Sequence, residues 1–136
     1  KYLNGKNITA SNGLDVTIAE IEAMDDDFKN EARQFLDSLV SHYVLDDGRL
    51  VIAHAGIKED YIGRGSGRVR EFCLYGDTTG ETDSFGLPVR LDWASDYRGK
   101  ATVVYGHTAC KDVRSQNNTF CIHTGCVFGG KLTAFR

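Results

Sequence analysis

The sequence predicts an α+β fold with an α/β-like arrangement of its strands, formed as one domain over residues 1–136. Apolar residues recur at helical spacing early in the chain, whereas the later apolar runs are short and bounded by turn residues. Three of these runs end in a histidine beside a small residue. Helices followed mainly by strands indicate an α+β domain, and the chain is long enough for one hydrophobic core.

The first predicted helix lies within residues 12–24. Thr17 and Glu20 have the three-residue spacing of a capping box, in which each side chain accepts a hydrogen bond from the other residue's backbone N–H. Ile18 and Ile21 give the segment a short apolar face. We therefore expect Thr17 to cap the start of this helix.

The second predicted helix spans residues 25–44 and has the clearer periodicity. Its apolar residues at helical spacing are Phe28, Ala32, Phe35, Leu36, Leu39, Val40 and Tyr43. Asp25–Asp27 place negative charge at its amino end, where the helix dipole favours it. His42 falls on this helix, and we expect it to lie at the surface or to contact the residues that bind a ligand without touching the ligand itself.

A hairpin is expected next, because Asp47-Gly48 forms a turn between two apolar runs. Its second strand runs into His54. Residues 63–70 (GRGSGRVR) indicate a glycine- and arginine-rich loop, and residues 70–77 indicate another strand. Residues 76–92 are rich in turn formers, and a loop of that length in a compact domain is often functional.

The last part of the chain is predicted to contain one helical turn and three strands. The turn falls at residues 93–97 (WASDY), and the two strands that follow end at His107 and His123. Residues 129–136 (GGKLTAFR) indicate a turn and a final strand. No internal repeat or low-complexity segment interrupts this order.

Composition excludes several classes of protein. The net charge of −3 argues against binding nucleic acid through bulk electrostatics, although a local basic patch could still hold one nucleic-acid end. No apolar stretch approaches the roughly 20 residues that cross a membrane, and the amino-terminal residues lack the apolar core of a signal peptide. The four cysteines form no C-x-x-C pair and predict no zinc knuckle. We expect them to be reduced and mostly buried in a cytoplasmic protein.

His54, His107 and His123 are the strongest candidates for a functional site. Ligands of open α/β sheets bind beyond the carboxyl ends of strands, so three strand ends that carry imidazoles suggest one shared site. Neutral imidazole is a common ligand of zinc, manganese, iron and nickel. Three histidines with an open position for water would form a self-contained zinc site. The alternative is three separate histidines, each hydrogen-bonded at a sheet edge.

Arginines form a second set of candidates, for binding a phosphate group. They are Arg64, Arg68 and Arg70 around the glycines of the loop, and then Arg90 and Arg98. Guanidinium groups bind phosphate oxygens in pairs, and glycines let backbone N–H groups approach. A solvated flexible loop is the alternative for that segment. Asp77, Glu81 and Asp83 are candidate acids or ligands, with solvated turn residues as the alternative.

Four stretches resemble a known family. They are LVIAHAGI, LYGDTTGETDSFGLPVR, DWASDYRGKATVVYGHT and TGCVFGGKLTA. These are similar to the binuclear metallophosphoesterases related to the serine/threonine protein phosphatases, and the resemblance covers essentially the whole chain. Within that group the chain most resembles the phosphatase domain of bacterial polynucleotide kinase-phosphatase, an RNA end-repair enzyme. The next resemblance is to the PrpE-type bis(5′-nucleosyl)-tetraphosphatases.

The resemblance implies a two-sheet β-sandwich flanked by helices, of which this chain would be the carboxyl-terminal half. It also implies two divalent metal ions, typically manganese with nickel, iron or zinc as alternatives. His54 and His107 would be ligands of one of them, and Ala55-Gly56 would leave room for it. Such a metal pair polarises a phosphoryl group and supplies a hydroxide nucleophile.

The chain departs from the family in two ways. The upstream motifs G-D-x-H-G, G-D-x-x-D-R-G and G-N-H, which carry the remaining ligands, do not occur in it. His123 replaces an aspartate that is expected to orient the family's catalytic histidine, so His123 is a candidate catalytic position. We expect the chain to hold part of a metal site and to require the missing amino-terminal half of the domain as its partner. A homo-oligomer stays open.

These features predict a metal-dependent phosphatase that acts on the phosphorylated end of a polynucleotide. The alternative within the same class is hydrolysis of a dinucleoside polyphosphate, and the loops over residues 64–92 would select between the substrates. A non-catalytic remnant that binds a metal or a partner chain is the alternative from a different class.

Overall fold

The computed structural model describes residues 2, 5, 8, 13–84 and 86–136. The chain divides into two compact units, Lys1–Val40 and Ser41–Arg136, and each is described by itself. Within the described residues, none of the helices combines the length and the apolar character needed to cross a membrane. The prediction of a single domain and that of a cytoplasmic location stay untested.

In the first unit, helix α1 (Leu14–Glu22) begins earlier than the sequence predicts. Gly13 precedes it in the left-handed conformation, with a φ of 83°, and no side chain caps its first turn. Thr17 therefore lies inside the helix, and the predicted capping box is wrong. The acidic Asp15 instead places negative charge in the first turn, where the helix dipole favours it.

Helix α2 (Asp26–Ser38) begins as predicted but is shorter. The Asp25 carboxylate accepts a hydrogen bond from the Phe28 N–H at 2.8 Å, which is the interaction of an N-cap residue. Leu39 is already extended, with a ψ of 131°, so the helix does not reach residue 44. Tyr43 and His42, predicted on the helix, lie on a strand of the second unit.

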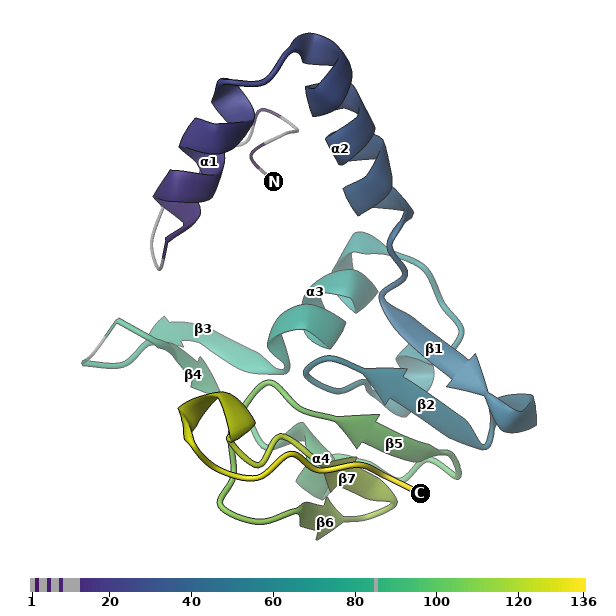
Figure 1. Cartoon of the computed structure of the whole chain (residues 1–136). Helices are drawn as coiled ribbons and strands as arrows, with labels where there is room; N and C mark the ends of the chain where they lie inside the picture. Colours follow the sequence, from purple (N-terminus) through teal and green to yellow (C-terminus); the bar gives the residue numbers. More distant parts are fainter. Residues whose placement is uncertain (1, 3–4, 6–7, 9–12, 85) are drawn as a thin grey trace. The chain divides into compact units, whose positions relative to one another are not determined.

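The second unit is built on a five-stranded sheet with the order β1-β2-β5-β7-β6. Its strands are β1 (His42–Leu45), β2 (Leu50–Ala53), β5 (Thr102–Tyr105), β6 (Arg114–Gln116) and β7 (Thr119–Cys121). Strands β2, β5 and β7 are parallel, whereas β1 and β6 pair antiparallel at the two edges. Figure 1 shows the parallel strands side by side. The carboxyl ends of these three strands therefore share one edge of the sheet. The predicted hairpin and the predicted strands before His54, His107 and His123 are confirmed.

Two other segments differ from the sequence prediction. Residues predicted as a strand form helix α3 (Gly67–Tyr75), because the Ser66 hydroxyl accepts the Val69 N–H and caps a helix there. Residues 76–92 are not one long loop but contain the antiparallel pair β3 (Thr78–Thr82) and β4 (Pro88–Arg90).

Helix α4 (Trp93–Asp96) confirms the predicted helical turn, and short 3₁₀ turns occur at Asp46–Gly48, Glu59–Tyr61 and Cys126–Phe128.

The carboxyl-terminal segment and β6 were also mispredicted. Residues 129–136 form no strand and make a single bridge, between Gly125 and Lys131. Strand β6 was missed, although Asn117-Asn118 marks its turn. Both asparagines have positive φ, 49° and 44°, as a two-residue turn between antiparallel strands requires.

The hydrophobic core lies on one face of the sheet. Val51 and Val103 are fully buried there against α3 and α4, which contribute Phe72 and Trp93. The opposite face carries alternate residues of the same strands, and Phe120 packs there against Phe135 with ring centroids 5.1 Å apart. The unit thus shows one layer of helices on a sheet, and the second sheet of the expected sandwich stays a prediction.

Trp93 explains why Ala55-Gly56 follows His54. The indole N–H donates to the Ala55 carbonyl at 3.1 Å, and the ring lies so close to Gly56 that a Cβ there would overlap it. Gly56 also has a φ of 120°, which L-residues rarely adopt. The space that Gly56 leaves is therefore filled by Trp93, and packing accounts for this glycine. That a metal lies beside His54 stays a prediction.

Replacing Gly56 with alanine should destabilise this unit by roughly 3 kcal/mol, because the new methyl group overlaps buried Trp93 and the backbone is strained. Denaturant unfolding monitored by Trp93 fluorescence would measure the change. The control is Gly65→Ala, where the added Cβ meets open space. A Gly56→Ala protein as stable as the control would contradict the packing argument.

His42 links β1 to the loop before α3. Its Nε2 accepts the Gly63 N–H at 2.9 Å, and its Nδ1 lies 3.0 Å from the Ser41 hydroxyl. A ring that accepts at Nε2 is neutral with its hydrogen on Nδ1. Burial lowers the pKa of His42, which agrees with a neutral ring.

Stability should therefore fall on acidification. Because the folded pKa of His42 lies below its ordinary value of 6.5, the unfolded chain binds the proton first as the pH drops below 6.5. The contribution of neutral His42 to the free energy of unfolding is complete above pH 6.5 and is lost as the pH falls through the lower folded pKa. Unfolding free energies measured between pH 7.5 and pH 5 should show this slope, to which His42 contributes roughly one proton at most. The slope should be smaller in His42→Gln; an identical slope would rule out His42 as its source.

Candidate functional site

His54 and His107 meet at the carboxyl edge of the sheet. His54 directly follows β2, and His107 follows β5 after Gly106. The Gly106 N–H donates to the His54 carbonyl at 2.8 Å and so continues the parallel ladder beyond both strands. His54 Nε2 and His107 Nδ1 are 2.9 Å apart, with the rings edge to face. Two of the three candidate histidines therefore share a site.

The backbone at His107 is strained. The Thr108 N–H donates to the Gly106 carbonyl at 2.9 Å, which encloses His107 in a three-residue γ-turn. The φ of His107 is 72°, the rare form of this turn for a residue with a side chain. Such a conformation costs about 1–3 kcal/mol and persists where the surrounding structure holds it.

The surroundings of His107 favour a neutral ring. Its pKa is lowered chiefly by burial, and further by the positive charge of Arg90 and by His54 and His123. Its Nε2 is buried and has no hydrogen-bond partner among the residues that the structure describes. Buried polar atoms are nearly always paired, so this nitrogen indicates a place for a ligand.

His123 lies near this pair but does not complete a metal site with it. Its ring lies beside Phe128, with centroids 6.3 Å apart, and its carbonyl accepts the Cys110 N–H. Over residues 13–84 and 86–136, together with the isolated described positions, no group of three His, Cys, Asp or Glu residues could hold a metal ion. The self-contained three-histidine zinc site is therefore not formed. A catalytic role for His123 stays a prediction.

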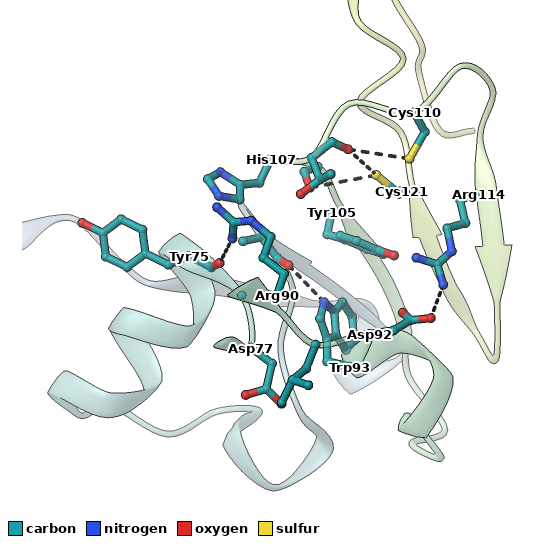
Figure 2. A pocket seen from close by; sticks show the side chains of 15 residues that line it. Tyr75, Asp77, Arg90, Asp92, Trp93, Tyr105, His107, Cys110, Arg114 and Cys121 are labelled. Atoms are coloured by element: carbon teal, nitrogen blue, oxygen red, sulfur yellow. Dashed lines mark hydrogen bonds and ion pairs between the residues drawn. The ribbon is translucent and has the colours of Figure 1, made fainter. Parts of the chain in front are cut away.

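A cavity of about 200 Å³ opens beside His107 (Figure 2). Four charged side chains line the cavity: Asp77, Arg90, Asp92 and Arg114. Asp77 forms an ion pair with Lys58 at 2.7 Å, and Asp92 forms one with Arg114. Arg90 donates instead to the neutral Tyr75 carbonyl, so this bond leaves its positive charge uncompensated.

Of the five predicted phosphate-binding arginines, Arg90 lines the cavity. Arg98 donates to the Ser95 and Tyr97 carbonyls and thereby supports the end of α4. The other three lie outside the cavity lining: Arg64 in a loop, and Arg68 and Arg70 on α3. Their binding of substrate stays a prediction.

The sequence did not indicate Arg114 or Asp92, because their pairing depends on β6, which was not predicted. Among the candidate acids, Asp77 reaches the cavity. Asp83 accepts the Leu87 N–H at 2.9 Å, as a turn residue does, and Glu81 lies on β3.

The chain is similar to curated proteins over its whole length. Relatives from Anoxybacillus flavithermus, Bacillus cereus and Bacillus thuringiensis are 51%, 47% and 46% identical to it. Each is named bis(5′-nucleosyl)-tetraphosphatase PrpE (asymmetrical), and this chain spans 57% of the length of each. No family model matches the chain. The relatives' name agrees with the second of the two resemblances; the closer likeness to polynucleotide kinase-phosphatase is not shown.

The site predicts weak binding of one divalent ion by this chain. Titration calorimetry with Mn²⁺ and Zn²⁺ should detect binding that falls at least tenfold in His54→Ala and in His107→Ala, because each variant removes an imidazole donor. His123→Ala is the matched control and should change the affinity little. Tight binding that is lost equally in all three variants would instead establish a three-histidine site.

Proposed function

We propose that this chain supplies part of the active site of a metal-dependent hydrolase that cleaves the phosphate chain of a dinucleoside polyphosphate. The contact between His54 and His107 carries the proposal, because converging imidazole nitrogens at a strand edge are typical metal ligands. The name of the relatives supports the substrate class. It favours the alternative drawn from the sequence over a polynucleotide end, which none of the three names mentions.

The two imidazoles fit a divalent ion. Nitrogen ligands lie about 2.0–2.1 Å from zinc, so two nitrogens on one ion are roughly 3 Å apart. His54 Nε2 and His107 Nδ1 are separated by 2.9 Å. Imidazole suits manganese, the metal we expect, and also nickel, iron or zinc. When bound, such an ion acts as a Lewis acid toward a phosphoryl oxygen and increases the acidity of water.

His107 has a second nitrogen available for the substrate. With Nδ1 as the ligand atom, Nε2 carries the hydrogen and can donate to a phosphoryl oxygen. This nitrogen is buried and unpaired within the described part of the chain. The lowered pKa keeps the ring neutral, which a ligand nitrogen requires.

Arg90 is suited to bind the phosphate chain. The Tyr75 carbonyl orients its guanidinium group without neutralising it, and the remaining N–H groups can reach phosphate oxygens in the cavity. Arg114 shares its charge with Asp92 and is the weaker candidate. Electrostatic attraction to a polyphosphate should therefore depend mainly on Arg90.

Two histidines do not fill the coordination shell of a catalytic ion. We propose that the remaining ligands come from polypeptide that the relatives have and this chain does not span. Tyr43, Leu45 and Ile52 are 58%, 43% and 39% exposed on the sheet face opposite the core, and this apolar surface could pack against that polypeptide. Such packing would also supply the second layer of the expected sandwich.

The function can be tested with this chain alone and within a polypeptide extended to the length of its relatives. With Mn²⁺, the extended polypeptide should hydrolyse bis(5′-adenosyl) tetraphosphate to a nucleoside monophosphate and a nucleoside triphosphate. His54→Ala and His107→Ala should lower kcat/KM at least ~100-fold. Arg90→Ala should raise KM roughly tenfold, because a charge-assisted hydrogen bond is lost.

Arg49→Ala is the matched arginine control, since Arg49 pairs with Asp46 in the turn before β2. It should leave kcat and KM unchanged. A phosphorylated oligonucleotide should be a poor substrate. If the oligonucleotide lost its terminal phosphate efficiently and bis(5′-adenosyl) tetraphosphate were not hydrolysed, the choice between the two substrates would be reversed. Activity that persists in His54→Ala and His107→Ala would refute the site.

A further inference from the structure

Cys110 and Cys121 point at the same backbone oxygen. The thiols donate to the Thr108 carbonyl, with sulfur–oxygen distances of 3.7 Å for Cys110 and 3.5 Å for Cys121. Figure 2 shows the two side chains converging there on the wall of the cavity. Burial raises the pKa of the Cys121 thiol, and the neighbouring Cys110 thiol raises it further, which agrees with contact between the two groups.

The backbone holds these two cysteines on neighbouring segments. The Cys110 N–H donates to the His123 carbonyl at 2.9 Å, which fixes the start of the 110–121 segment against the end of β7. Cys121 is the last residue of that strand. A disulfide requires two sulfurs that can approach to about 2.05 Å from neighbouring backbone positions. The shared Thr108 carbonyl and the bond from Cys110 N–H to His123 place the two cysteines on neighbouring segments.

The same thiols hold the strained turn at His107. Cys121 Sγ lies 3.9 Å from the Gly106 carbonyl as well as 3.5 Å from that of Thr108. These are the carbonyls on either side of His107, whose φ is 72°. The two S–H donors therefore help to keep a conformation that the residue would not adopt by itself.

We propose that Cys110 and Cys121 form a redox-active dithiol, which a peroxide converts to a disulfide, and that the modification releases the turn holding His107. Cys110 is half-buried and meets the oxidant, whereas Cys121 is 2% exposed and reacts with the product. The other cysteines do not form such a pair in the described structure: Cys73 lies beside His42, and Cys126 is exposed.

The reaction balances with hydrogen peroxide as the oxidant. The Cys110 sulfur attacks one peroxide oxygen, the O–O bond breaks, and a sulfenic acid and water form. The Cys121 sulfur then attacks the Cys110 sulfur, the S–O bond breaks, and the hydroxide leaves as water with the thiol proton. Two thiols lose one hydrogen each, and the peroxide is reduced to two waters.

Neither sulfur of a disulfide carries a hydrogen, so both donors to the Thr108 carbonyl disappear together. We expect the γ-turn to relax and the His107 ring to move from His54. When the groups that hold a metal-ligand side chain in place are removed, the affinity for the metal commonly falls about 10–100-fold. Oxidation should accordingly weaken Mn²⁺ binding by about tenfold.

The test uses this chain with Cys126→Ser, which removes the exposed thiol and prevents links between chains. After treatment with hydrogen peroxide, peptide mapping should find Cys110 joined to Cys121, with the intact mass lower by two hydrogens. The NMR signals of the His107 ring should shift while those of His42 stay, and a reducing agent should restore them. This readout needs neither metal nor substrate, so it is independent of the proposed function.

Cys110→Ser is the control, because its hydroxyl can still donate to Thr108 and no disulfide can form; the His107 signals should not respond to peroxide. Stable sulfinic acid at Cys110 with Cys121 still reduced would overturn the proposal. A disulfide that forms and leaves the His107 signals unmoved would overturn the link to the turn.

Discussion

The parallel pairing of β2 with β5 is the constraint on which the second unit depends. It places Val51 beside Val103 in the core, where both are fully buried. It also extends past the strands through the Gly106 N–H and the His54 carbonyl, so that the histidines arrive at one edge. The same backbone register therefore sets both the packing of the sheet and the distance between the imidazoles.

Around this edge, close packing leaves little freedom to rearrange. Trp93 occupies the space that Gly56 leaves, and its ring also lies edge to face with Tyr105 at the end of β5. On the other side, the cysteine thiols contact the carbonyls that flank His107. The strained turn at His107 follows directly after Tyr105 and Gly106, and the thiols contact the carbonyls that flank it. Strain of this kind is commonly found where a protein prepares a site for binding.

Much of this arrangement could be predicted from the sequence, but only where the signal was local. The apolar runs before His54, His107 and His123 predicted the strands β2, β5 and β7, and Asp47-Gly48 predicted the hairpin of β1 and β2. Helix α3 was missed because its short, mixed sequence also fits a strand, and the Ser66 cap decided the outcome. Gly56 was misread because its neighbour Trp93 is distant in sequence. Arg114 was missed because its partner Asp92 lies on another element, and no spacing along the chain reveals such a pair.

The long separation between β2 and β5 has a consequence for the order of folding. The hairpins β1–β2 and β6–β7 are local and can form early, whereas His54 and His107 are 53 residues apart. Closing a loop of that size is entropically unfavourable until the contacts between the two strands form and stabilise it, and parallel pairing is correspondingly slow. The two imidazoles therefore meet in a late step of folding. A nascent or partly folded chain would display single, separated histidines, and metal affinity would emerge only when the sheet is complete.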